Sequence, residues 1–119
     1  MLAATLEQAA IRTLAHPNEL DRKRIERALK TRKRYRYVTP KVTTTVGGYR
    51  IESPCCSRNV DPSGGVVDVA LLLHDADGAK WELFRKNHAR DLWQLDSTHA
   101  RLHGALDRLS ADPERRFWQ

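Results

Sequence analysis

Residues 66–85, VVDVALLLHDADGAKWELFR, contain two predicted β-strands and the turn that joins them. Val66 to His74 is rich in β-branched and apolar side chains, which suit a half-buried strand. Asp77-Gly78 is a dipeptide typical of tight hairpin turns. Lys80 to Arg85 then alternates apolar and polar side chains, as a returning strand does. The stretch therefore predicts an antiparallel β-hairpin.

The segments on either side of this hairpin carry further strand patterns. Tyr35 to Val46 is rich in Tyr, Val and Thr, and Gly47-Gly48 predicts a tight turn into a returning strand over residues 49–53. Residues 54–65 are loop-like in composition. Asp91 to Leu95 predicts one more short strand, so we expect four to five strands built from hairpins.

Helical patterns flank the strands. Residues 5–15 predict a short amphipathic helix, and a second, basic helix is expected from about Leu20 to Arg34, with Asn18 or Asp21 capping its start. A third helix is expected near the C-terminus, capped by Ser97 or Asp96. Its apolar stripe consists of Leu102, Ala105, Leu106 and Leu109.

The order of these elements predicts the α+β class: an antiparallel sheet flanked by an N-terminal basic helix and a C-terminal helix. With 119 residues, the chain has room for one modest core. We expect a single α+β domain over residues 18–119, with residues 1–17 as a short amphipathic helix that moves independently. Phe117-Trp118 is expected to pack against the sheet, because two terminal aromatic side chains suggest a docked end.

Positive charge is concentrated in one segment. Residues 22–41 hold ten Lys or Arg and one acid, Glu26, a net charge of +9, whereas the rest of the chain holds 11 basic and 14 acidic residues, a net −3. Such an uneven distribution of positive charge attracts anionic partners. The sequence therefore favours DNA, RNA or an acidic protein as the partner.

On a helical wheel, four cations share one band opposite the apolar positions Ile25 and Leu29. Spaced i, i+4, i+7 and i+11, they form a row roughly 16 Å long. The four are Lys23, Arg27, Lys30 and Arg34. Glu26 is placed to pair with Lys30, but one carboxylate cannot neutralise four cations.

The helix runs into the segment Arg32-Lys33-Arg34-Tyr35-Arg36-Tyr37. Aromatic side chains beside arginines suit base stacking together with phosphate contact. We therefore expect Tyr35 and Tyr37 to stack on bases and Arg36 to contact phosphate. The alternative interpretation is that the basic face is merely solvated and that the two tyrosines pack in the core.

Two alternatives involve the adjacent cysteines Cys55 and Cys56. Zinc binding with His99 and His103, expected at i,i+4 on the last helix, is disfavoured because structural sites usually space their cysteines as C-x₂₋₄-C. A thiol nucleophile is also possible in principle, but no local catalytic motif supports it. Neither glycine pair has the following helix and Lys of a phosphate-binding loop.

Three patches of the sequence resemble a bacterial family of small proteins, one of the numbered domains of unknown function (three-zero-two-four). The patches are RIERAL at residues 24–29, WELF at 81–84 followed by Trp93, and DPERRFW at 112–118, whose pattern Asp-Pro-x-x-x-Phe-Trp is the most specific. The resemblance implies a bacterial origin and a small standalone domain. It transfers no catalytic residue.

The sequence as a whole predicts a small, non-enzymatic binding protein without a cofactor, most simply one that contacts nucleic acid through its basic helix. The alternatives are a module that docks an acidic protein and a metal or thiol site at Cys55 and Cys56. No secretory signal, disulfide framework or apolar run of about 20 residues is evident, so a cytoplasmic protein without membrane contact is expected.

Overall fold

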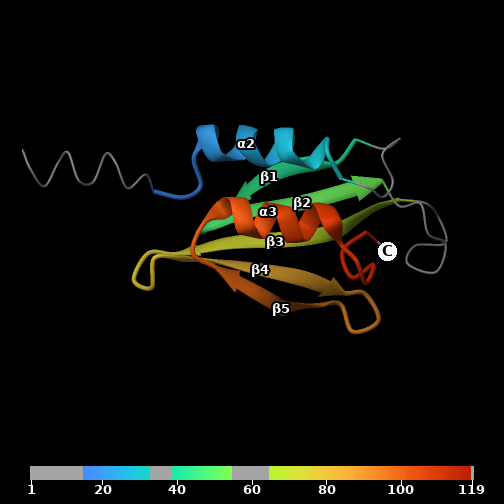
Figure 1. Cartoon of the computed structure of the whole chain (residues 1–119). Coiled ribbons are helices and arrows are strands. Elements are labelled where there is room, and N and C mark those ends of the chain that lie inside the picture. The colour runs from blue at the N-terminus through green and yellow to red at the C-terminus, as the bar shows by residue number, and fades with distance from the viewer. Residues whose placement is uncertain (1–14, 33–38, 55–64, 119) are drawn as a thin grey trace, which may run out of the picture.

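The computed structural model describes residues 15–32, 39–54 and 65–118. These residues form two helices and a five-stranded antiparallel sheet, in agreement with the predicted α+β class (Figure 1). In chain order the elements are α2 (Glu19–Leu29), β1 (Lys41–Thr45), β2 (Gly48–Pro54), β3 (Val66–Asp75), β4 (Lys80–Asn87), β5 (Leu92–His99) and α3 (Leu102–Ala111). The helix predicted over residues 5–15 lies almost wholly outside the described residues.

Every strand of the sheet pairs with its neighbour in sequence, in the order β1-β2-β3-β4-β5. The two predicted hairpin turns are confirmed. At the first turn, Gly47 has a φ of 78°, and a Cβ on Gly48 would lie 1.9 Å from the carbonyl oxygen of Leu72. At the second, the Asp75 side chain accepts hydrogen bonds from the backbone amides of Asp77 and Gly78 at 3.1 and 3.2 Å. Short-range turn chemistry therefore sets the register of the strands.

Both helices lie on the same face of the sheet (Figure 1). Alternate side chains of the strands point to this inner face, where Tyr49, Leu72 and Leu83 form a buried cross-strand row. Ile25 and Leu29 of α2 pack onto the same core. The core is completed from α3 and the C-terminal segment by Ala105, Leu106, Leu109, Phe117 and Trp118.

The last seven described residues fold back under α3. Asp112 ends the helix in the left-handed region at φ 36°, and its carboxylate accepts hydrogen bonds from the backbone amides of Arg116, Phe117 and Trp118. The indole Nε1 of Trp118 donates to the carbonyl oxygen of Leu109 at 2.9 Å. The expected docking of the two terminal aromatic side chains is thus confirmed.

The boundary between β5 and α3 differs from the prediction. β5 extends to His99, so Asp96 and Ser97, expected to cap the last helix, lie within a strand. α3 starts three residues after that strand, and its N-cap, Arg101, forms no side-chain capping hydrogen bond. At the start of α2, by contrast, the Asn18 side chain accepts from the Asp21 amide at 2.8 Å, as predicted.

Candidate nucleic-acid interface

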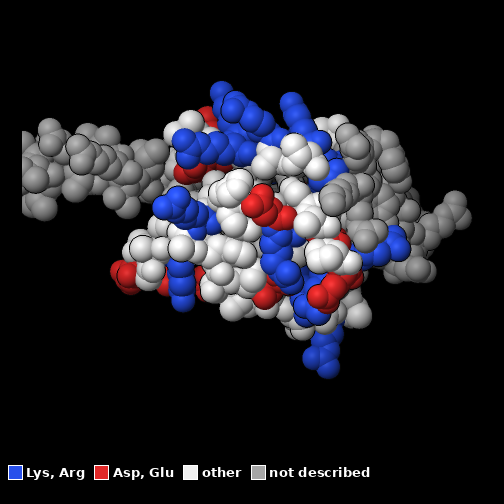
Figure 2. Space-filling view, viewed as in Figure 1, with Lys and Arg blue, Asp and Glu red and all other residues white. Residues whose placement is uncertain are grey.

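The exposed face of α2 carries three of the predicted phosphate-contacting residues. Lys23, Arg27 and Lys30 are all exposed, on the side of the helix away from the buried Ile25 and Leu29. Figure 2 shows Lys and Arg side chains gathered over α2, whereas basic and acidic side chains mix below it. At 1.5 Å per residue, the row from Lys23 to Lys30 is about 10 Å long.

The acidic side chains of α2 pair with other cations. Arg22 donates hydrogen bonds to both Glu19 and Glu26, so Glu26 does not form the predicted pair with Lys30. These hydrogen bonds raise the pKa of Arg22 and lower that of Glu19. Asp21 pairs with Arg24 at 3.3 Å. None of the ion pairs formed among the described residues includes Lys23, Arg27 or Lys30.

α2 is shorter than predicted, because it ends at Leu29 instead of Arg34. The Thr31 hydroxyl donates to the carbonyl oxygen of Ala28, and the Arg32 guanidinium donates to that of Leu29, both at 2.7 Å. Arg32 is 3% exposed and lies 4.8 Å from the centroid of the Trp118 ring. The Arg32 side chain therefore points into the protein and does not contribute to the cationic surface.

The other four predicted contact residues lie outside the described part of the chain. They are Arg34, Tyr35, Arg36 and Tyr37. Cys55 and Cys56 also fall outside it, so the zinc and thiol alternatives stay untested there. The expected sharing of a helix face by His99 and His103 is wrong, because His99 belongs to β5 and His103 to α3.

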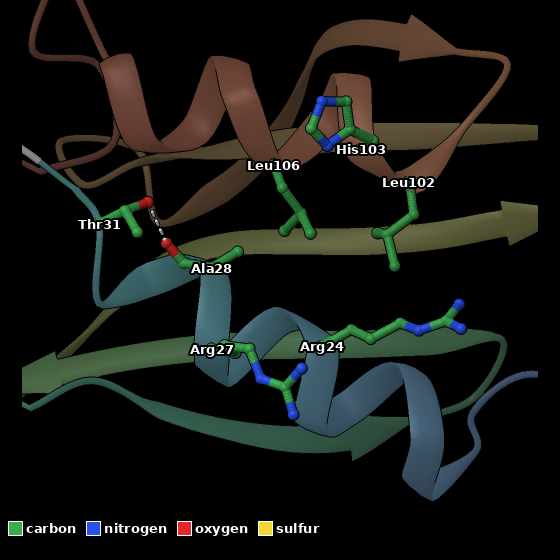
Figure 3. Close-up of a pocket in the computed structure, with 7 residues that line it drawn as sticks. All are labelled: Arg24, Arg27, Ala28, Thr31, Leu102, His103 and Leu106. Atoms are coloured by element: carbon green, nitrogen blue, oxygen red, sulfur yellow. Dashed lines mark hydrogen bonds between the residues drawn. The ribbon is translucent and has the colours of Figure 1, made fainter.

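An open groove of about 360 Å³ separates α2 from α3 beside the basic row (Figure 3). Its apolar lining comes from Ala28 of α2 and from Leu102 and Leu106 of α3. Arg24 and Arg27 line its α2 side, where the Arg24 side chain is 60% exposed. The remaining lining residues are Thr31 and His103. Sequence reasoning found the apolar stripe of α3 but not the groove, because no local signal places α3 beside α2.

A polar cluster joins β5 to α3. The Ser97 hydroxyl lies 2.8 Å from Nε2 of His99 and 2.9 Å from Oδ2 of Asp96. The Asp96 side chain is fully buried, and Arg108 of α3 donates two hydrogen bonds to it. Although burial alone raises the pKa of Asp96, the hydrogen bonds from Arg108 and Ser97 hold it below its usual value. The cluster thus anchors α3 to the edge of the sheet.

A second cluster surrounds His16 beneath the start of α2. Nδ1 of His16 lies 2.9 Å from the Tyr49 hydroxyl and 3.6 Å from Oδ2 of Asp21. Its ring packs against those of His74 and Trp81, with centroid separations of 4.5 and 4.6 Å. Burial and the neighbouring His74 lower the pKa of His16, and Asp21 opposes them in part. A neutral imidazole therefore fits this cluster best.

Residues 14–119 match the model of one protein family, described as Domain of unknown function (DUF3024). The chain belongs to this family. The resemblance seen in the three sequence patches is thereby confirmed. No curated protein and no solved structure matches the chain.

The sequence pattern Asp-Pro-x-x-x-Phe-Trp of this DUF3024 chain coincides with the folded-back C-terminal segment. Asp112 binds the backbone amides of that segment, and Phe117 and Trp118 enter the core. In this DUF3024 chain the motif is therefore a structural element. Within the described ranges, no three His, Cys, Asp or Glu side chains are grouped so that they could hold a metal ion, and no helix is long and apolar enough to cross a membrane.

Proposed function

We propose that this protein binds nucleic acid through the exposed face of α2. Lys23, Arg27 and Lys30 contact the phosphates, because none of them is engaged in an ion pair with a described carboxylate. This observation carries the proposal. Like-charged neighbours at i,i+4 destabilise a helix slightly, and a polyanion relieves that repulsion while releasing its own counterions.

The groove beside the row supports the same proposal. Arg27 belongs both to the row and to the groove lining, so a strand bound along α2 passes the groove opening. There, Leu102 and Leu106 offer apolar contact to a base or sugar. Arg34 and Arg36 as further phosphate contacts, and Tyr35 and Tyr37 as stacking platforms, remain part of the proposal outside the described residues.

A second candidate is the docking of an acidic protein. The groove combines an apolar lining with arginine side chains, which suits an amphipathic helix that carries acidic residues beside one apolar anchor. Competition separates the two candidates, because DNA displaces a nucleic-acid ligand but does not displace a specific protein partner at moderate salt.

The experiment is fluorescence anisotropy with labelled single-stranded DNA, single-stranded RNA and duplex DNA, in NaCl from about 25 to about 200 mM. With the five proposed phosphate contacts to a single strand, the slope of log K against log salt is expected to be about −3.5. The double variant Lys23→Gln/Arg27→Gln reduces the steepness of that slope by about 1.4 and weakens binding to all sequences alike.

The matched control is Lys80→Gln/Arg90→Gln, which removes the same charge at the β3–β4 and β4–β5 turns. We expect the control to bind almost as the wild type does. Equal weakening in both double variants would mean that net charge alone, and not the α2 face, explains the binding. Absence of binding at low salt would refute the proposal.

A further inference from the structure

The face of the sheet opposite the two helices carries an apolar row. Because side chains alternate along a strand, the neighbours of the buried Tyr49, Leu72 and Leu83 point to this outer face. The strand register aligns three of these neighbours, Arg50, Leu71 and Phe84, and continues the line to Leu95 of β5. Leu71, Phe84 and Leu95 form the apolar row, and Arg50 stands at its β2 end.

Further apolar side chains enlarge the apolar surface around this row. Within the row, Leu95 is 51% exposed; beside it, Val66 at the start of β3 is 65% exposed. Trp93 lies on the same face of β5, and Nζ of Lys86 stands over its indole ring, 4.9 Å from the ring centroid. Neither α2 nor α3 covers this surface, because both pack on the inner face (Figure 1). Apolar patches of this kind on soluble proteins commonly mark interaction sites.

The charges around the row cancel, unlike those of α2. The outer-face charged side chains comprise four basic and four acidic residues: Lys41, Arg50, Lys80, Lys86, Glu52, Asp68, Asp75 and Glu82. Asp68 pairs with Arg50 at 2.6 Å and with Lys86 at 3.3 Å. A second copy of the chain therefore meets little like-charge repulsion here, whereas two cationic α2 faces repel each other.

We propose that two copies of the chain pack through this outer face, about a two-fold axis that runs across the strands along the row. Leu71, Phe84 and Leu95 then each face the same residue of the second copy, as an isologous interface requires. Arg50 also faces Arg50 of the second copy, with its charge offset by the ion pair to Asp68. On β4, Glu82 and Lys86 lie two residues on either side of Phe84. The same axis therefore brings Glu82 opposite Lys86 of the second copy, so the face is self-complementary in charge.

The size of the face suits a stable dimer. Five strands about 4.8 Å apart, with about eight residues each at about 3.3 Å per residue, give a face of roughly 600 Å² in projection. Side-chain relief adds to the projected area, which brings the accessible surface close to the about 800 Å² per partner of a standard interface.

The test is sedimentation velocity of the full chain, supported by light scattering, with protein at about 100 µM. A mass of about 27 kDa, twice 13.6 kDa, is expected for the wild type. Leu95→Lys and Leu95→Glu each place like charges against each other across the axis and raise the dimer Kd by about tenfold or more. A 1:1 mixture of the two variants brings opposite charges together and restores the dimer.

Val46→Lys is the control, because Val46 is 94% exposed in the β1–β2 turn and lies outside the proposed interface. Circular dichroism melts of all variants verify that they fold. A wild type that is monomeric at this concentration overturns the proposal. So does a dimer that both Leu95 variants retain, because such a dimer uses a different surface.

Discussion

The carboxylate of Asp112 accepts a hydrogen bond from the backbone amide of Trp118 at 2.8 Å, so the residue that ends α3 also fixes the chain six positions later. Asp112 is 1% exposed and Trp118 is 2% exposed. The hydrogen bond therefore forms away from water, where a backbone amide without an acceptor costs free energy of folding. It links the two ends of the Asp-Pro-x-x-x-Phe-Trp segment.

Asp112→Asn should lower the free energy of unfolding by about 2 kcal/mol, because the amide group loses the charge and presents N–H donors toward backbone N–H groups. Urea unfolding followed by circular dichroism measures the change. Glu114→Gln, at an exposed carboxylate two residues further on, is the control and should stay within about 0.5 kcal/mol of the wild type. Equal effects would mean that the buried contacts of Asp112 contribute little.

Arg108→Ala should cost about 3 kcal/mol, because it leaves the fully buried Asp96 carboxylate without its main partner. The pKa of Asp96 is lowered in the folded protein, so its stabilising contribution is present above the ordinary carboxyl range and disappears as the pH falls through the folded pKa. The stability of the wild type should therefore fall more steeply with pH as the pH drops below the ordinary carboxyl range. Arg90→Ala, at an exposed arginine, should leave both the stability and the acid transition unchanged.

Acidification should destabilise the protein through His16. Its folded pKa lies below the ordinary value of 6.5, so the unfolded chain binds a proton more readily, and stability falls as the pH drops below 6.5. His88 has a similarly lowered pKa, caused by burial and by Lys86, and contributes with the same sign. The urea midpoint should be lower at about pH 5.5 than at about pH 7.5.

Two variants isolate the contribution of His16 to this pH effect. His16→Gln should reduce the difference between the two midpoints, because no imidazole remains to be protonated in the cluster. His103→Gln should preserve the difference, because the His103 side chain is 85% exposed on α3. If the pH difference survives His16→Gln in full, another group is responsible.

The sequence predicted the hairpins correctly because their turn signals are local. Asp77-Gly78 and Gly47-Gly48 specify turns through backbone conformation and short-range hydrogen bonds, whatever packs above the sheet. Asn18 was identified as a helix cap for the same reason. Features that depend on three or four consecutive residues are thus readable without the tertiary structure.

The errors arose where distant residues override local preference. The basic segment after Leu29 favours a longer helix, but Arg32 turns inward to lie over Trp118, which is 86 positions further along the chain. Asp96 and Ser97 resemble helix caps, yet Asp96 is held by Arg108. The helical wheel anticipated that Lys23, Arg27 and Lys30 would be exposed, whereas the groove depends on α3 lying beside α2 and had no local signal.

The meeting of Arg32 with Trp118 has a consequence for synthesis on the ribosome. Strands that pair with their sequence neighbours can assemble hairpin by hairpin as the chain emerges. However, the segment that follows α2 completes its buried contacts only when Trp118 is free of the exit tunnel. A nascent chain halted within α3 therefore exposes an incomplete hydrophobic core to chaperones and proteases.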